Sequence, residues 1–304
     1  MSEPARQRTW SAGRPVDLAR TLAPLRRGPG DQAHRMVGGV FWWACDTPDG
    51  AGTLAVQAQH GEVDATAWGP GADWLLAGLP ELLGERDDWT GLDCAAVPVL
   101  ARTLRRYPGL RLPRTRLVLD ALVPAVLEQR VTGNESRRAW QSLLYRFGSP
   151  APGPIQSLRV PPSAPVLLAV PTWDWHRLGV DLQRQRAIRA AATVASRLAE
   201  CVGLPEADAI ARLRLIPGVG EWTAAETVQR ALGHPDAVSV GDFHIHDLVV
   251  HALTGRPRGD DDEMLRVLEP WRGQRQRVVR LIELCGVGKP RFGPRYAPID
   301  MRAM

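Results

Sequence analysis

A short glycine-rich turn between two helical patterns is the feature that most restricts how this 304-residue chain can fold. The turn is Ile216-Pro217-Gly218-Val219-Gly220, with helical patterns over about 205–215 before it and 221–232 after it. Glycine leaves the main-chain N–H groups accessible, and the N-terminus of the second helix adds a favourable dipole. The pattern predicts either an anion-binding hairpin or a plain helix–helix turn that binds nothing.

Basic side chains are concentrated in the C-terminal two-thirds of the chain. Residues 1–100 carry 8 basic and 13 acidic side chains, whereas 101–304 carry 30 and 20. This excess suits a polyanion such as DNA, although solvated helix faces would show the same composition. Of the 38 basic residues only Lys289 is a lysine, so Schiff-base chemistry has a single side-chain amine available.

The hydrophobic patterns predict an α+β fold that is mainly α. Apolar residues alternate over 54–58 and 63–67, as in half-buried strands, and a helical pattern follows over 72–83. From about residue 99 onward the pattern is helical, with segments over 117–131, 134–147 and 183–202, the last ended by Gly203. We therefore expect a small antiparallel sheet followed by a multi-helix core.

These patterns suggest three parts. We expect a flexible N-terminal tail over 1–12, an α+β domain over 13–98 and a helical domain over 99–304, with the hairpin at about 205–233. No apolar stretch is long enough to cross a membrane, and the first residues lack the apolar core of a signal peptide.

The hairpin and an aspartate downstream of it resemble a known signature. Asp242 stands in Val240-Gly241-Asp242-Phe243-His244-Ile245, 20 residues after Trp222. This pairing resembles the helix–hairpin–helix (HhH-GPD) DNA glycosylase superfamily, and the nearest branch is similar to the bacterial 3-methyladenine DNA glycosylase II type. The resemblance implies that residues 99–304 form a glycosylase core whose hairpin grips the DNA backbone.

The resemblance makes Asp242 the catalytic residue. A carboxylate near C1′ can stabilise an oxocarbenium-like state and orient the attacking water. Asp is also a favoured residue at a helix start, and an apolar-periodic segment follows at 243–253. Both roles can hold for the same side chain.

Trp222 occupies the place where lyase members of the superfamily carry a Schiff-base lysine. The resemblance therefore implies a monofunctional enzyme without lyase activity. In the 3-methyladenine branch a tryptophan there stacks on the base, and a ring face favours a cationic base. A core tryptophan is the alternative.

For three other candidate pocket residues the sequence leaves two positions open. Glu226 lies at i+4 from Trp222, where better-known members carry an aromatic residue; it could face the base or point away as a surface glutamate. Trp173 and Trp175 are candidates for a second pocket wall, with a core position as the alternative.

The resemblance also assigns DNA contacts. They fall on the hairpin and on the end of an earlier helix, at Gly218, Val219, Gly220, Thr223, Gln129 and Arg130. Arg130 stands where the family often carries a leucine wedge that fills the space of the extruded base; a plain surface arginine is the alternative. Hairpins of this family often hold a monovalent cation, Na+ or K+, through carbonyls that would here belong to Arg214, Ile216 and Val219. No other cofactor is implied.

The sequence thus predicts a monofunctional DNA glycosylase of base excision repair that flips and hydrolyses alkylated bases of the 3-methyladenine and 7-methylguanine type. We expect a cytoplasmic, nucleoid-associated monomer that binds damaged duplex DNA and no membrane. Two alternatives stay open: a glycosylase of the same fold for deaminated or oxidised bases such as hypoxanthine or uracil, and a non-catalytic protein that uses the hairpin for DNA binding.

Overall fold

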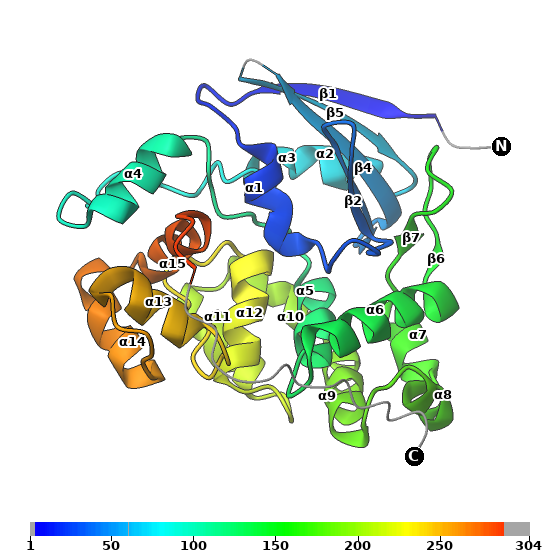
Figure 1. Cartoon of the computed structure of the whole chain (residues 1–304). Coiled ribbons are helices and arrows are strands. Elements are labelled where there is room, and N and C mark those ends of the chain that lie inside the picture. The colour runs from blue at the N-terminus through cyan, green and yellow to red at the C-terminus, as the bar shows by residue number, and fades with distance from the viewer. Residues whose placement is uncertain (1–3, 60, 289–304) are drawn as a thin grey trace.

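The computed structural model describes residues 4–59 and 61–288, in which one antiparallel sheet lies above a larger set of helices (Figure 1). The sheet has five strands in the order β1-β5-β4-β3-β2, and a separate two-stranded sheet, β6-β7, packs against it at β3. The strands are β1 Arg6–Ser11, β2 His34–Val37, β3 Val40–Thr47, β4 Gly50–Gln59, β5 Glu62–Trp68, β6 Ser149–Pro150 and β7 Arg159–Val160.

The helices follow the sheet along the chain, except for α1, which precedes β2. They are α1 Leu18–Leu22, α2 Ala72–Ala77, α3 Leu79–Leu82, α4 Pro98–Arg106, α5 Val118–Leu127, α6 Gly133–Phe147, α7 Ala164–Ala169, α8 Thr172–Arg177, α9 Leu182–Thr193, α10 Ala195–Ala199, α11 Glu206–Arg214, α12 Glu221–Ala231, α13 Ile245–Thr254, α14 Asp261–Leu268 and α15 Arg275–Leu284. Short 3₁₀ turns occur at Ala23–Leu25, Glu200–Gly203 and Glu269–Trp271. The predicted fold class, mainly α with a small antiparallel sheet, is confirmed.

The flexible tail predicted over 1–12 is wrong for residues 6–11. These residues form β1, which pairs with β5 from Arg6 opposite Ala67 to Ser11 opposite Glu62. Trp10 packs against the apolar cluster beneath the sheet, and this anchors the strand. The sequence does not indicate this strand because most of its side chains are polar and exposed. The backbone pairing that stabilises it comes from β5, more than 50 residues further along the chain.

Two predicted helices are broken in the structure. The pattern over 72–83 yields α2 and α3, because the chain turns at Gly78 and continues with Pro80 in the first turn of α3. The pattern over 183–202 yields α9, α10 and a 3₁₀ turn, with the break at Val194. Apolar periodicity continues through both breaks, so periodicity alone could not locate them.

The helices enclose two apolar cores. One is built mainly from α5, α6, α9 and α12, and the other lies among α4, α13, α14 and α15. The segment 232–244 passes from the first core to the second, because it joins α12 to α13. This junction positions the candidate site described below.

Asp31 joins the sheet layer to the helices. Its carboxylate is fully buried and accepts hydrogen bonds from the amides of Arg27 and Ala33 and from the indole of Trp140 on α6. Although burial alone would raise the pKa of Asp31, these amides and His34 lower it to about 2. The carboxylate is therefore charged and paired at neutral pH.

In the part of the chain that the structure describes, the helices are too short and too polar for any of them to cross a bilayer.

Asp120 on α5 gives the fold a testable pH dependence. Burial, and then repulsion from Asp46, raise the pKa of Asp120 to about 7, and its Oδ2 has no hydrogen-bond partner among the described residues. The folded protein therefore binds this proton more tightly than the unfolded chain, and stability is lost as the pH rises from about 4 to about 7. We expect Asp120→Asn to raise the melting temperature at pH 8 and to raise it by a clearly smaller amount at pH 5.

The matched control is Asp49→Asn, in the exposed turn between β3 and β4, which should not change the melting temperature at either pH. An equal gain for Asp120→Asn at pH 5 and pH 8 would contradict the assigned titration.

Candidate active site

The predicted hairpin is formed by α11, α12 and the turn between them, and its bounds agree closely with the sequence pattern. Ile216 and Val219 are buried in the larger helical core, whereas Gly218 and Gly220 face outward. Gly218 has φ of +86°, and a Cβ added there would lie 2.7 Å from the Cβ of Ala187. A Cβ added at Gly220 would meet no atom within 4 Å, so the space beside this glycine is open.

Gln129 holds the turn from the end of α5. Its Nε2 donates to the carbonyl of Gly218 at 2.9 Å and to Oγ1 of Thr223 at 2.8 Å. Thr223 is only 2% exposed, and both side chains support the hairpin from within. DNA contacts at Gln129 and Thr223 stay predictions.

Asp242 is held by three N–H donors. Its Oδ1 accepts from the amides of His244 at 2.7 Å and Ile245 at 3.0 Å, and α13 begins at Ile245. Its Oδ2 accepts from the indole of Trp222 at 3.1 Å. The carboxylate therefore accepts from the amides at the start of α13, but the N-cap of this helix is His244 and not Asp242 as predicted. Asp242 forms no ion pair with a described residue, and it lines a cavity.

Trp222 contacts the site through its indole N–H. The residue lies at the start of α12, partly exposed, and does not line the cavity. Its hydrogen bond to Asp242 brings together two residues 20 positions apart, as the predicted signature requires. Stacking of Trp222 on a base stays a prediction.

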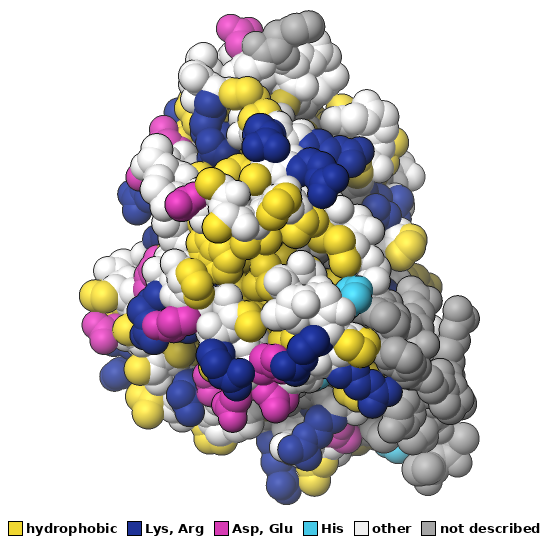
Figure 2. Space-filling view, turned by 60° about the vertical axis from the view of Figure 1, so that its left-hand side comes forward, with side chains coloured by type: hydrophobic (Ala, Val, Ile, Leu, Met, Phe, Trp, Pro, Cys, Tyr) yellow, Lys and Arg dark blue, Asp and Glu magenta, His cyan; other side chains and the backbone are white. Residues whose placement is uncertain are grey.

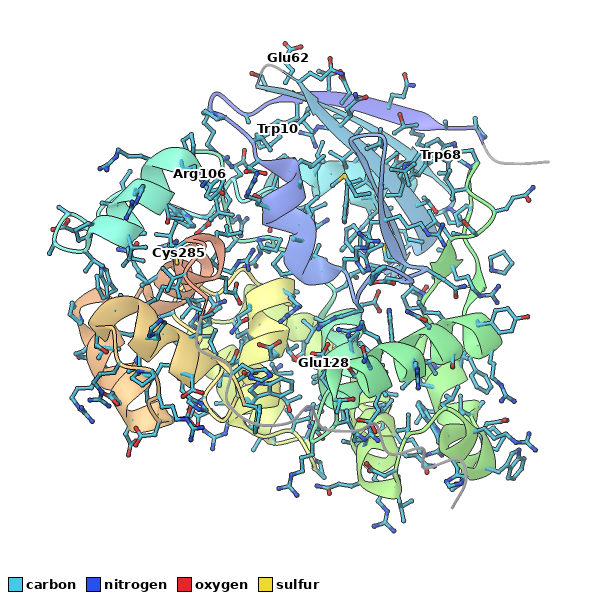
Figure 3. All side chains as sticks on the ribbon, in the orientation of Figure 1. Trp10, Glu62, Trp68, Arg106, Glu128 and Cys285 are labelled. Carbon is cyan, nitrogen blue, oxygen red and sulfur yellow. The ribbon has the colours of Figure 1, made fainter. Side chains whose placement is uncertain are left out.

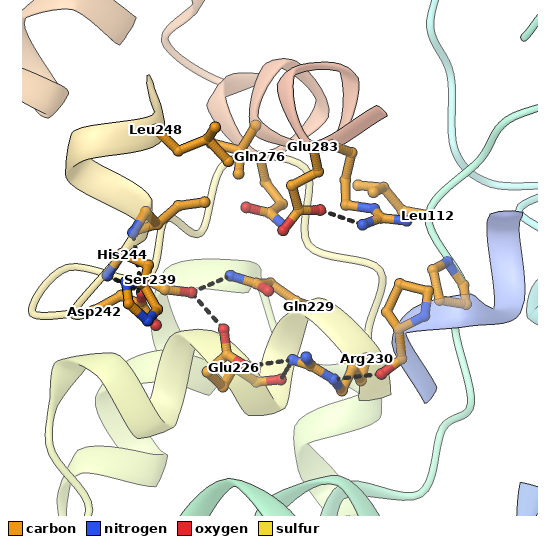
Figure 4. Close-up of a pocket in the computed structure, with 15 residues that line it drawn as sticks. Leu112, Glu226, Gln229, Arg230, Ser239, Asp242, His244, Leu248, Gln276 and Glu283 are labelled. Atoms are coloured by element: carbon orange, nitrogen blue, oxygen red, sulfur yellow. Dashed lines mark hydrogen bonds and ion pairs between the residues drawn. The ribbon is translucent and has the colours of Figure 1, made fainter. Parts of the chain in front are cut away.

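The cavity has a volume of ≈ 290 Å³, at the small end of ligand sites, and lies between α12, α15 and the start of α13 (Figure 4). Its lining mixes polar and apolar side chains in similar measure. The lining residues are Pro24, Leu112, Pro113, Glu226, Gln229, Arg230, Ser239, Asp242, His244, Ile245, Leu248, Gln276, Val279, Arg280 and Glu283.

Glu226 faces this cavity, so the surface alternative is wrong. The residue is 9% exposed and accepts a hydrogen bond from Oγ of Ser239 at 2.6 Å. Its other oxygen pairs with Arg230 at 2.8 Å. Burial alone would lower the pKa of Arg230, but Glu226 and Glu128 raise it above the usual value, so Arg230 stays charged.

The tryptophans proposed as a second wall lie elsewhere. Trp175 is fully buried in the helical core, so it cannot stack on a base and that prediction is wrong. Trp173 is 65% exposed on α8 and does not line the cavity. The Trp-x-Trp spacing alone does not indicate whether either side chain is buried in a core or lines a cavity.

Arg130 follows Gln129 directly and is exposed. Its φ is +54°, in the left-handed region that favours glycine. The hairpin contacts at this end of α5 come from the neighbouring Gln129. Nothing in the residues around Arg130 predicted this conformation.

Many arginines are used inside the protein. Buried or half-buried ion pairs join Arg27 to Glu128, Arg277 to Asp87 and Arg275 to Asp236. On the face shown in Figure 2, basic side chains border an apolar area and are mixed with acidic ones. The arginine excess therefore supports the fold as well as any DNA surface.

Sequence reasoning missed the cavity residues of the loop before Asp242 and of α15. Ser239 donates to Glu226 and accepts from Gln229 at 2.9 Å, and Gln276 and Arg280 complete the opposite wall. Their i and i+4 spacing on α15 was the one available signal. Lys289, the lone lysine, lies outside the described residues.

Comparison with known proteins agrees with this architecture. No protein-family model matches the chain. It is similar to two proteins described as probable bifunctional transcriptional activator/DNA repair enzyme AlkA, from two strains of Mycobacterium tuberculosis, with 33% identity over 151 residues. The match covers 49% of this chain and 30% of each relative, so the chain spans less than a third of their length.

Solved structures match over nearly the whole chain. A 3-methyladenine DNA glycosylase from Archaeoglobus fulgidus superposes with a TM-score of 0.76 and 16% identity, covering 91% of this chain and 98% of that one. The Clostridium acetobutylicum 8-oxoguanine glycosylase/lyase in complex with double-stranded DNA gives 0.68 and 10%, with coverage of 92% and 96%. These likenesses confirm the fold implied by the hairpin and Asp242.

The two hairpin glycines should respond differently to substitution. Gly218→Ala places a methyl group against Ala187 at a left-handed φ, so we expect a loss of about 1–3 kcal/mol in the free energy of unfolding. Gly220→Ala has open space at φ −89° and should change it by less than about 0.5 kcal/mol. Urea unfolding measures both, and equal losses would contradict the assigned geometry.

Proposed function

We propose that this chain, a member of the helix–hairpin–helix DNA glycosylase superfamily by fold, hydrolyses the N-glycosidic bond of damaged bases in duplex DNA. The observation that carries the proposal is the Asp242 carboxylate. Three N–H donors orient it, no described cationic residue forms an ion pair with it, and it lines a cavity of ≈ 290 Å³. A flipped base in that cavity would place its sugar next to the carboxylate.

Asp242 supports the chemistry by electrostatics. Cleavage of the glycosidic bond develops positive charge on the sugar, which a fixed carboxylate stabilises. The same carboxylate can orient water for attack at C1′ and accept its proton. The amides of His244 and Ile245 hold the carboxylate in place without neutralising its charge, because they are uncharged donors.

Alkylated purines are the substrates that this chemistry fits best. Methylation at N3 or N7 makes the base cationic and a good leaving group, so no strong general acid is required. A protein described as a 3-methyladenine DNA glycosylase shares the fold. The cavity also suits hypoxanthine as a second substrate, because the polar part of its lining offers hydrogen bonds to the base.

The proposed reaction uses water and forms no Schiff base. The position at the start of α12 that a lyase lysine would occupy holds Trp222, whose indole is engaged with Asp242. The product would be free base and an intact abasic site.

The hairpin would bind the DNA backbone beside the lesion, with the protein acting as a monomer. The outward faces of Gly218 and Gly220 and the N-terminus of α12 suit a phosphate. A monovalent cation held by carbonyls of Arg214, Ile216 and Val219 fits this turn in donor type, since main-chain oxygens suit Na+ or K+. The carbonyl of Ile216 also accepts the amide of Val219 at 3.0 Å. Such a cation would neutralise part of the phosphate charge there.

Asp242→Asn tests the proposed chemistry. The wild-type protein should release 3-methyladenine or 7-methylguanine from duplex DNA and give no borohydride-trapped complex. The variant keeps the shape of the side chain but loses its charge, so single-turnover excision should fall by at least about a hundredfold while binding of damaged DNA persists. The control Asp262→Asn, exposed on α14, should excise normally.

Substantial excision by Asp242→Asn would remove the aspartate from the mechanism. No base release by the wild-type protein, with DNA binding retained, would favour a non-catalytic DNA-binding protein.

Arg130→Gly tests whether this arginine fills the space of the extruded base. Glycine relieves the left-handed backbone, so the melting temperature should rise. Binding to a duplex with an abasic-site analogue should nevertheless weaken by about tenfold, because the guanidinium can stack on bases and pair with phosphate. Arg138→Ala removes an equal charge from the exposed face of α6 and serves as control. Equal weakening by both variants would identify Arg130 as a surface charge only.

A further inference from the structure

Gln276 on α15 presents an unpaired amide to the cavity. The residue is 5% exposed, and its Oε1 is a buried acceptor that no described residue supplies with a hydrogen bond. Its main-chain N–H is satisfied by the carbonyl of Pro235 at 2.9 Å, so only the side chain is left without a partner. Buried polar side chains in proteins are nearly always hydrogen-bonded, so this one calls for a ligand.

Arg280 lies one helical turn further along the same face. Its terminal nitrogens are used: one pairs with Glu283, and the other donates to the carbonyl of Arg20 at 3.2 Å. Its Nε–H is buried and has no partner among the residues that the structure describes. The guanidinium is therefore fixed at its tip and leaves one donor free.

The opposite wall of the cavity differs in this respect. Glu226 is satisfied by Ser239 and Arg230, and Gln229 donates to Ser239 and to the carbonyl of Ala237. In Figure 4 Gln276 extends from α15 toward α12 and faces this closed network across the cavity. The free donors and acceptors are thus concentrated on the α15 side.

We propose that Gln276 reads the polar edge of the extruded base. This inference rests on the proposed function and adds a residue that recognises the edge of a purine in the cavity. Oε1 would accept from a base N–H while Nε2 donates to the neighbouring oxygen or nitrogen, as amide side chains pair with purines in bidentate fashion. The Nε–H of Arg280 supplies a further donor beside it.

The chemistry defines a substrate class. Purines that carry a donor and an acceptor side by side are complementary to the amide: hypoxanthine and 7-methylguanine through N1–H and O6, and 3-methyladenine through its amino group and N1. Because the amide can present either order of donor and acceptor, the site accepts all three. A purine without substituents lacks the N1–H and O6 pair and is disfavoured.

The test compares hypoxanthine with unsubstituted purine in otherwise identical duplexes, with Asp242→Asn as the parent protein so that the bases stay attached. We expect the parent to bind the hypoxanthine duplex about tenfold more tightly, the amount that one to two net hydrogen bonds provide. Adding Gln276→Met, which matches the side chain in length and is apolar, should abolish the preference. Gln276→Glu, which keeps the acceptor and loses the donor, should reduce it.

Gln7→Met, exposed on β1, is the matched control and should keep the full preference. Thermal unfolding of each variant verifies the fold, and Gln276→Glu decides the question if Gln276→Met fails to fold. A parent without any preference, or a preference that survives both Gln276 variants, would overturn the inference. Excision by the wild-type protein is measured separately: no release from any duplex would refute the proposed catalysis, while the binding comparison would still decide the role of Gln276.

Discussion

The ion pair between Glu226 and Arg230 on α12 is the interaction on which the site depends. Charges removed from water are tolerated only when they are well paired. The Glu226–Arg230 pair also interacts electrostatically with a second ion pair, Arg27–Glu128. Arg230 also donates to the carbonyl of Pro24, next to the sheet layer. Figure 3 shows Glu128 near the centre of the molecule, where these layers meet. The network fixes α12, and α12 carries the hairpin at one end and the cavity wall along its side.

The position of Asp242 follows from the same helix. Trp222 begins α12 and donates to one carboxylate oxygen, while the start of α13 satisfies the other. A shift of α12 would therefore move the hairpin, the cavity wall and one donor to Asp242 together. This explains why a spacing of 20 residues between Trp222 and Asp242 carries structural meaning: it is the length of α12 plus the loop that returns to its beginning.

The sequence predicted what depends on neighbouring residues. Turn glycines, helix ends and alternation over short stretches located the hairpin, the helix after Asp242 and the antiparallel sheet, because each is determined within a few positions. Features that depend on distant partners were not predictable. The burial of Glu226 against Ser239 and the burial of Trp175 in the helical core both depend on residues that are distant in the sequence. The strand β1 was missed for the same reason.

The charges around the cavity explain why hydrogen bonding should dominate base selection. Glu226 is balanced by Arg230, and Glu283 by Arg280, so these pairs add little net field at the base. Asp242 forms no ion pair with a described residue, and it lines the same cavity. In the proposed reaction such a carboxylate would stabilise the positive charge that develops on the sugar in the transition state more than the ground state of a bound cationic base. Under this proposal, discrimination between bases would arise from directional contacts with the unpaired donor and acceptor of α15.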